Sequence, residues 1–178
     1  GASSGRALLG FIEDNQLQIE EIHRFPNEHI KLGGTLYWDF MALWKNFRES
    51  LKICGRNGYD KLAGIGVDTW GVYFGLICSD GKLVGRPLCY RDGCTEGMDQ
   101  LIEEEIAKDK LYKITGISLT RVASLPQLVA MKHSDSKDRF KIAKSFLMMP
   151  DLFRYFLGGD AVVERTIAGS SQLLNIKT

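Results

Sequence analysis

The chain has 178 residues, enough for one hydrophobic core or for one domain of a larger enzyme. Its 23 basic and 22 acidic side chains nearly cancel, and no run of Lys or Arg forms the stripe that binds a phosphate backbone, so nucleic acid is not an expected partner. The apolar runs are far shorter than the ~18 residues of a membrane span, and no signal segment is recognisable, so a membrane partner is not expected either.

The cysteines and histidines show no metal-ligand spacing. The cysteines are Cys54, Cys78, Cys89 and Cys94, and the histidines are His23, His29 and His133. No CxxC pair occurs, and the histidines are scattered along the chain. We therefore expect reduced thiols in a cytosolic protein and no zinc site.

The N-terminal third predicts a β-hairpin followed by an amphipathic helix. Residues 6–13 and 17–25 are apolar-rich, and a short Asp-Asn pair between them is typical of a hairpin turn. From Asp39 onward the apolar residues recur at roughly helical spacing. Asp39 is a plausible N-cap of this helix, and Gly55 is its expected end.

The middle of the chain predicts further strands. Residues 61–68, KLAGIGVD, form a short continuous apolar run with two glycines, the pattern of a strand buried on both faces. Residues 72–78 and 88–90 are expected to be strands as well, and the turn sequence SDGK ends the first of them.

The C-terminal half predicts mostly helices. We expect helices at residues 96–107 and 124–132, a strand at 145–149, a helix at 151–157 that ends at a Gly-Gly pair, and a short strand near Val162. No internal repeat and no low-complexity linker interrupts the pattern, so one α/β domain is expected.

Two stretches have the residue types of a ligand site. The opening GASSGR combines small residues, whose backbone N–H groups can converge on an anion, with donors on Ser3, Ser4 and Arg6; a simple surface turn is the alternative. Asp68 follows the predicted strand 61–68, and the carboxyl ends of strands in open α/β sheets bind ligands; a strand-end cap is the alternative.

Two further positions allow both a structural and a functional interpretation. Gly71 would let a ligand approach the backbone, or would simply form a tight bend. Arg91 and Asp92 could form a local ion pair, while Arg91 could equally hold a hydroxylated ligand.

Taken in chain order, the segments GASSGR, EIHRFPN, LYWD, IGVDTWGV, YRD and LMMPD closely resemble the N-terminal half of the rhamnulokinase family within the FGGY carbohydrate kinases. The resemblance runs from residue 1 to about residue 174, and IGVDTWGV with YRD is its specific part. It implies an α/β fold, a ribonuclease-H-like (actin-like ATPase) domain with a mixed sheet flanked by helices. It also implies that residues 1–178 lack the first strand of that sheet, with its acidic residue near the magnesium, and the C-terminal domain.

The resemblance also implies roles for individual residues. The ATP-binding loop would comprise Ala2, Ser3, Ser4, Gly5 and Arg6. A backbone position that touches the sugar matches Gly71, and the other motif positions of the sugar cleft match Asp68, Trp70, Arg91 and Asp92. No catalytic residue is expected in this chain, because the general base of the family lies in the C-terminal domain.

The implied reaction is phosphoryl transfer from ATP, with magnesium (Mg2+), to a ketose hydroxyl in the cytoplasm, giving a ketose 1-phosphate such as L-rhamnulose 1-phosphate. The alternatives are an inert relative that senses sugar or nucleotide, and a kinase for another sugar such as fuculose. Five residues at three places depart from the family pattern: Tyr73 replaces an aspartate of WGVD, residues 122–124 replace a Phe-Asn-Thr-like stretch, and Ile167 replaces an asparagine. We therefore expect the sugar, or the way it is held, to differ somewhat from that of a typical rhamnulokinase, with Tyr73 in contact with the sugar. Repacking of these residues behind the pocket is the alternative.

Overall fold

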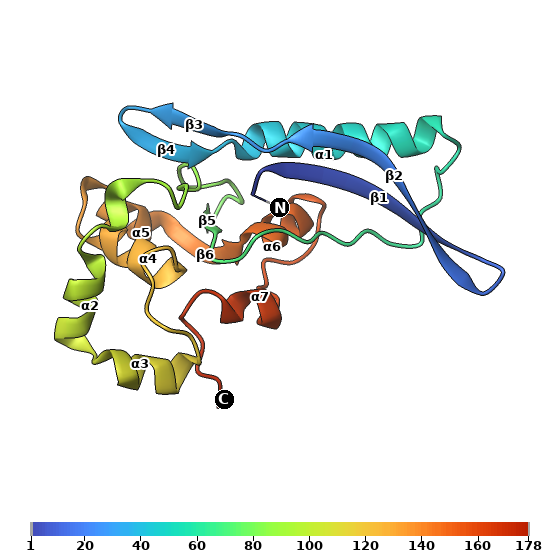
Figure 1. Cartoon of the computed structure of the whole chain (residues 1–178). Helices are drawn as coiled ribbons and strands as arrows, with labels where there is room; N and C mark the ends of the chain where they lie inside the picture. Colours follow the sequence, from blue (N-terminus) through green and yellow to red (C-terminus); the bar gives the residue numbers. More distant parts are fainter. Residues whose placement is uncertain (1, 178) are drawn as a thin grey trace.

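The computed structural model describes residues 2–177 and begins with a long antiparallel hairpin (Figure 1). Strand β1 (Ser4–Glu13) pairs with β2 (Gln16–Pro26). Asp14 and Asn15 have φ values of 49° and 63°, and positive φ at both central residues is what a type I′ hairpin turn requires. The predicted hairpin is therefore confirmed, with β1 beginning before the expected residue 6.

A second hairpin, β3 (His29–Leu32) and β4 (Thr35–Trp38), was not predicted. Its turn consists of Gly33 and Gly34, with φ values of 59° and 85°. A Gly-Gly pair between two short β-prone runs is a recognised hairpin signal, so this element could have been inferred from the sequence.

Helix α1 (Phe40–Arg56) follows directly and packs on the first hairpin (Figure 1). The Asp39 carboxylate accepts a hydrogen bond of 2.9 Å from the Ala42 N–H, which confirms Asp39 as the N-cap. The predicted end at Gly55 was wrong by one residue, because the helix continues to Arg56 and Asn57 is the C-cap.

The prediction of a strand at residues 61–68 was wrong. These residues run as an irregular extended segment from the end of α1 towards the next strand (Figure 1). A strand needs a neighbour to accept and donate its ladder hydrogen bonds, and within residues 2–177 no backbone hydrogen bond joins this segment to another.

The centre of the molecule is the antiparallel pair β5 (Phe74–Cys78) and β6 (Ala143–Met148), in which Phe74 lies opposite Met148. Both predicted strands are confirmed with small shifts of their ends. The predicted strand 88–90 was wrong: it is reduced to an isolated bridge between Leu88 and Tyr37. Every ladder of the described part of the chain is antiparallel, so no parallel neighbour supplies the other half of a mixed sheet there.

The remaining elements are short helices. They are η1 (Gly93–Thr95), α2 (Met98–Glu105), α3 (Lys108–Thr115), α4 (Ser124–Lys132), η2 (Asp135–Asp138), α5 (Arg139–Ile142), α6 (Met149–Phe156) and α7 (Arg165–Gly169). The helix predicted at 124–132 is confirmed, and the helices predicted at 96–107 and 151–157 are present as α2 and α6. Helices α3 and α7 were missed.

The strand expected near Val162 was wrong. Its side chain is 56% exposed, and its N–H donates to the carbonyl of Asp160 only two residues earlier. A backbone group used in so local a turn is not available to a sheet ladder.

The hydrophobic core lies between α1, β5, β6 and α6. Its buried members are Trp38, Phe40, Leu43, Tyr73, Ile77, Cys89, Leu147, Met149, Leu152 and Phe153. Burying one large apolar side chain completely contributes about 1.5–3 kcal/mol, so this cluster is the main source of stability. All four cysteines are free, as expected from their spacing.

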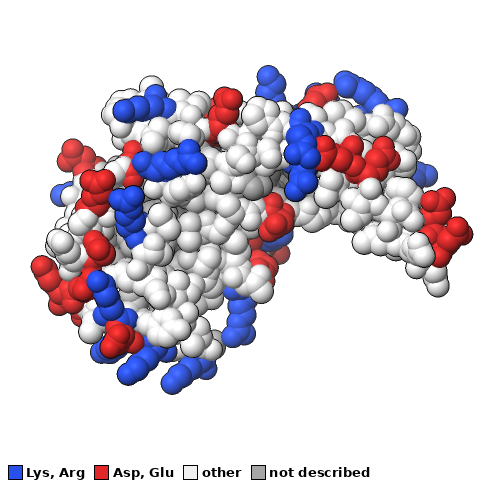
Figure 2. All heavy atoms as spheres, viewed as in Figure 1, with Lys and Arg blue, Asp and Glu red and all other residues white. Residues whose placement is uncertain are grey.

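The face seen in Figure 2 carries interspersed charges of both signs and no broad basic area. Between residues 2 and 177, none of the helices has both the length and the apolar character that crossing a bilayer requires.

Candidate functional site

A groove of about 590 Å³ separates the first hairpin from the segment that follows α1. Its lining includes Ser4, Gly5 and Arg6 from β1. Asp68 and Trp70 line it as well, and side chains of α1 and α6 complete it. The structure therefore brings part of the predicted phosphate-binding segment and part of the predicted sugar-binding segment to one hollow. The other predicted site residues do not line it, namely Ala2, Ser3, Gly71, Tyr73, Arg91 and Asp92.

The opening segment is largely strand, which corrects the expectation of a loop. Ala2 and Ser3 precede β1 and are exposed, but Ser4 to Arg6 already belong to its ladder with β2. Gly5 lies opposite Phe25, and a Cβ at Gly5 would overlap the ring of Phe25. Packing beneath this ring is thus sufficient to explain a glycine at this position.

Arg6 is the cation of the groove. Its side chain is exposed, and its position faces Arg24 across the hairpin. Arg24 is held by Glu21 at 2.6 Å, whereas none of the salt bridges found within residues 2–177 involves Arg6. The pKa of Glu21 is lowered, chiefly by the hydrogen bond from Arg24 and more weakly by the charge of Arg6. The Arg6 guanidinium therefore remains able to pair with an anion.

The backbone is strained at the other end of the predicted sugar segment. Val72 has φ of 66°, a left-handed conformation that is a genuine outlier for a β-branched residue. Such a conformation costs of order 1–3 kcal/mol and is found mostly at binding and active sites. Gly71 precedes it, and a Cβ there would lie 3.1 Å from the Ser170 hydroxyl oxygen. The turn at residues 71–72 is therefore both strained and closely packed.

An aromatic cluster lies beside this turn. Trp38 and Trp70 have ring centroids 4.5 Å apart, Trp38 and Tyr73 are 5.5 Å apart, and Tyr73 and Tyr90 are 5.9 Å apart. The indole N–H groups of both tryptophans and the Tyr73 hydroxyl are buried without a hydrogen-bond partner of normal geometry among the described residues. Buried polar groups nearly always find a partner, so this concentration of three is unusual.

Tyr73 lies inside this cluster and not on its surface. Its side chain is 1% exposed, and burial raises the pKa of its phenol well above the ordinary value. In this conformation its ring offers no face to a ligand. Ile167 also packs against buried side chains, those of Phe74, Leu76, Met131 and Met148. Both placements agree with the alternative of repacking behind the pocket.

The YRD segment contains no ion pair of its own. The Arg91 guanidinium is exposed and lies 5.5 Å from the ring centre of Tyr90, and hydrogen bonding to Tyr90 is the main cause of its raised pKa. The Asp92 carboxylate instead accepts the N–H of Leu36 at 2.7 Å and that of Cys94 at 2.9 Å. Asp92 thus connects this turn to β4, and Arg91 is the member that solvent or a ligand can reach.

Functional reasoning from the sequence singled out residues 122–124 but connected no side chain with Val72. Ser124 and Gln127 of α4 bond its carbonyl, and the Ser170 hydroxyl accepts its N–H. These contacts join residues 52, 55 and 98 positions apart, so no local pattern could have revealed them.

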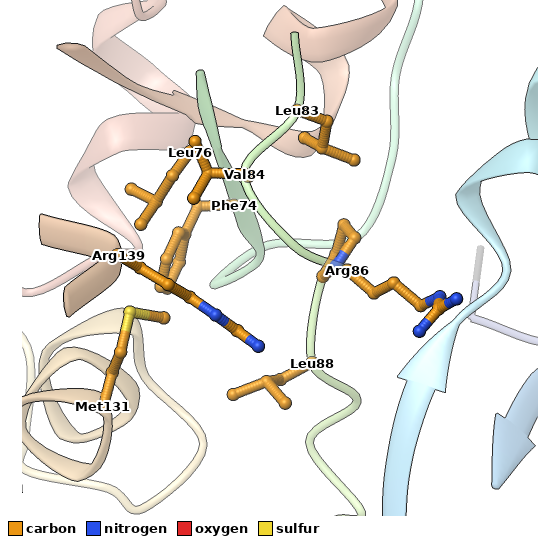
Figure 3. A pocket seen from close by; sticks show the side chains of 10 residues that line it. Phe74, Leu76, Leu83, Val84, Arg86, Leu88, Met131 and Arg139 are labelled. Atoms are coloured by element: carbon orange, nitrogen blue, oxygen red, sulfur yellow. The ribbon is translucent and has the colours of Figure 1, made fainter. Parts of the chain in front are cut away.

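A second, much smaller cavity of about 10 Å³ lies between β5 and α4. Figure 3 shows Arg139 pointing into the space between Met131 and Leu88. A space of this size holds about one water molecule, so it is not a sugar or nucleotide site.

The described residues form no metal-ligand cluster: no group of three or more His, Cys, Asp or Glu side chains is suitably arranged between residues 2 and 177. The donor set that a magnesium ion prefers, several oxygen ligands around one point, is therefore not assembled by these side chains alone.

Comparison with known proteins identifies the class of protein that has this groove. The profile of the N-terminal domain of the FGGY family of carbohydrate kinases matches residues 1–178. The chain therefore belongs to the FGGY family of carbohydrate kinases. The predicted family is confirmed.

Within that family, the chain is similar to rhamnulokinases. It is 40% identical over 178 residues to the rhamnulokinase of Bacteroides thetaiotaomicron and 39% identical to that of Halalkalibacterium halodurans. Each match covers the whole chain but only 36% and 38% of the relative. The chain thus spans little more than a third of the length of these relatives.

Solved structures confirm the fold class. The xylulose kinase of Rhodospirillum rubrum superposes with a TM-score of 0.82 at 17% identity, covering 99% of this chain and 37% of that one. The gluconate kinase of Lactobacillus acidophilus gives 0.81 at 17% identity, covering 99% and 35%. The predicted α/β fold, a ribonuclease-H-like (actin-like ATPase) domain, is confirmed.

Proposed function

We propose that the full-length protein transfers a phosphoryl group from ATP to a hydroxyl of L-rhamnulose or a related ketose. In this proposal the chain supplies one half of the active-site cleft. The family and its rhamnulokinase relatives support the type of reaction. The observation that carries the proposal is the groove, which places Arg6 of β1 and the Asp68–Trp70 segment around one hollow.

The phosphate side of the proposed site is the start of β1. Arg6 supplies a guanidinium, Ser4 supplies a hydroxyl group and Gly5 contributes backbone to the lining of the groove, while the exposed Ala2 and Ser3 precede it. A hydrogen bond between such a charged donor and phosphate contributes roughly 1.5–3 kcal/mol. Several donors around one anion would fix the position of the transferred phosphoryl group, and positioning is the main part of this chemistry.

The sugar side of the proposed site is the segment around the strained turn. The half-buried Trp70 offers an apolar ring to the C–H edge of a sugar, and the exposed Asp68 carboxylate can accept a hydroxyl. The Gly71 backbone follows Trp70 and is the proposed sugar contact, on the side that is not packed against Ser170. Arg91 adds a donor from the neighbouring turn, while Asp92 acts by holding that turn in place.

The groove is also the proposed position of a further strand of the full-length protein. β1 has β2 as its ladder partner, and residues 61–68 have none between residues 2 and 177. An extended segment between them would bond both free backbone edges and cover Leu62 and Ile65, which are 39% and 49% exposed. We propose that residues 1–178 are an N-terminal domain completed by this strand and by a C-terminal domain that supplies the general base.

ATP-dependent phosphoryl transfer is expected to use magnesium, which neutralises charge on the phosphates when it is bound. Because the described side chains form no metal-ligand cluster, we assign none of them to this ion. The four free thiols are consistent with a reducing compartment, and we propose the cytoplasm as the location.

The test is a coupled assay of the full-length protein with ATP, magnesium and a panel of rhamnulose, fuculose, ribulose and xylulose. We expect turnover of at least one ketose, with the 1-phosphate as product. A protein that binds sugar or nucleotide but turns over no ketose would instead be the inert, sensing relative. Preference for fuculose over rhamnulose would support the proposed phosphoryl transfer but make fuculose the substrate.

A further inference from the structure

The conformation of Val72 is maintained by side chains from distant parts of the chain. Its φ of 66° lies in the left-handed region, which a valine does not adopt without support. The other non-glycine residues with positive φ among those described are Asp14, Asn15 and Gln172. Asp and Asn tolerate that region in turns, so the strain at Val72 needs a separate explanation.

Both backbone groups of Val72 are bonded to side chains. The Ser124 hydroxyl donates to its carbonyl at 2.7 Å, and the Gln127 amide donates to the same oxygen at 3.2 Å. The Val72 N–H donates to the Ser170 hydroxyl oxygen at 2.9 Å. We refer to Ser124, Gln127 and Ser170 as the Val72 clamp.

The clamp residues are themselves fixed. Ser124 is 0% and Gln127 is 3% exposed, and the Gln127 amide also donates to the Val122 carbonyl at 2.9 Å. The Ser170 hydroxyl donates to the Ile167 carbonyl at 2.7 Å, which orients its lone pairs towards Val72. A buried polar network with its hydrogen bonds satisfied is rigid, so α4 and the end of α7 determine how the turn is oriented.

The turn at Val72 orients the proposed sugar segment. On its C-terminal side the Tyr73 carbonyl accepts the N–H of Met149 at 2.9 Å, so the chain enters the core directly after Val72. On its N-terminal side lie Gly71, Trp70 and Asp68, for which no backbone hydrogen bond to the core is found among residues 2–177. Rotation of the backbone at Val72 would therefore move the whole Asp68–Gly71 segment relative to the core.

We propose that Ser124, Gln127 and Ser170 are positioning residues for the sugar, acting through the left-handed turn at Val72. This inference rests on the proposed function. The clamp keeps the Gly71 backbone and the Trp70 ring in the orientation that binds the ketose before the ketose arrives, and so lowers the free energy lost on binding.

The test uses Ser124→Ala and Ser170→Ala in the full-length protein, with Ser171→Ala as the matched control. Ser171 is a buried serine at the same helix end, and its hydroxyl donates to the Ala168 carbonyl and accepts the N–H of Leu173 instead of bonding Val72. We expect the clamp variants to raise KM for the ketose about tenfold, the change expected for one lost hydrogen bond, with kcat and KM for ATP within about twofold. Ser171→Ala should leave ketose KM unchanged.

Two further measurements separate the clamp from a general loss of stability. Hydrogen–deuterium exchange at the Val72 amide should become faster in Ser170→Ala and stay unchanged in Ser171→Ala. Val72→Gly should partly restore ketose KM in the Ser124→Ala background, because glycine adopts positive φ without support. A wild type that turns over no ketose overturns the proposed function and the sugar-positioning role with it. An active wild type whose clamp variants match Ser171→Ala in ketose KM overturns the inference alone.

Discussion

The two halves of the molecule differ in how completely they are packed. At the β5–β6 pair and α6, the side chains of Leu147, Met148, Met149 and Leu152 are all 0% exposed. On the first hairpin, Ile12, Leu17 and Ile19 are 69%, 64% and 62% exposed. The packed half fixes the strained turn, while the open half forms one wall of the groove. A site built between a rigid core and an incompletely covered wall can be precise on one side and adaptable on the other.

The largest expected effect is on the packed half. Leu152→Ala removes a fully buried side chain from the core and should lower the free energy of unfolding by about 2–5 kcal/mol. Leu17→Ala on the exposed hairpin is the control and should change it by no more than about 0.5 kcal/mol. Urea unfolding followed by tryptophan fluorescence measures both. Equal losses would show that the two halves are equally packed.

A smaller effect is expected where the open half has its own packing constraint. Gly5→Ala places a methyl group into the ring of Phe25 and should destabilise the protein by about 1–3 kcal/mol. Gly10→Ala in the same strand is the matched control, since its nearest neighbour there, a Leu17 methyl carbon, is 3.6 Å away. Thermal unfolding compares them, and if Gly5→Ala is no worse than Gly10→Ala, then the glycine is not explained by Phe25.

The sequence predicted the elements whose signals are local. The Asp-Asn turn, the Asp39 cap and the helix at 124–132 each depend on neighbouring residues and were confirmed. The strand at 61–68 was wrong because a strand also needs a partner, and its apolar pattern says nothing about where that partner lies.

For the candidate site, too, the sequence indicated the features with local signals and not those that depend on distant packing. The residue types of GASSGR and IGVDTWGV indicated the two walls of the groove, and the structure brings parts of both together. The pattern could not show that Tyr73 is buried or that Ser170 bonds Val72, because both depend on the packing of α4, α6 and α7.

Arg6, which lies on the open half, allows a functional test of the comparison between the two halves. Arg6→Ala in the full-length protein should raise KM for ATP about tenfold and leave KM for the ketose unchanged, because its guanidinium faces the proposed phosphate position. Arg24→Ala is the control, since Arg24 is already paired with Glu21 at 2.6 Å. Steady-state kinetics with each substrate varied in turn give the answer, and a change confined to the ketose would contradict the assignment.

The smallest effect concerns a carboxyl group of the packed half. Asp151 is 2% exposed, and burial raises its pKa despite the N–H of Glu164 and the nearby charge of Arg154. Because the folded state holds this proton to higher pH than the unfolded state, stability should fall as pH rises from the unfolded pKa through the folded one. Asp151→Asn should flatten this fall, and the exposed Asp160→Asn controls for the loss of one charge. Plots of the unfolding free energy against pH that run parallel for wild type and Asp151→Asn across this window would contradict the raised pKa of Asp151.

The most direct test is a crystal structure of the full-length protein with a non-hydrolysable ATP analogue and a ketose. We predict a phosphate oxygen within hydrogen-bond distance, about 3 Å, of the Arg6 guanidinium and the ketose against the Gly71 backbone in the same cleft. A nucleotide whose phosphates lie away from the start of β1, or a ketose bound elsewhere than at the Asp68–Gly71 segment, would contradict the account.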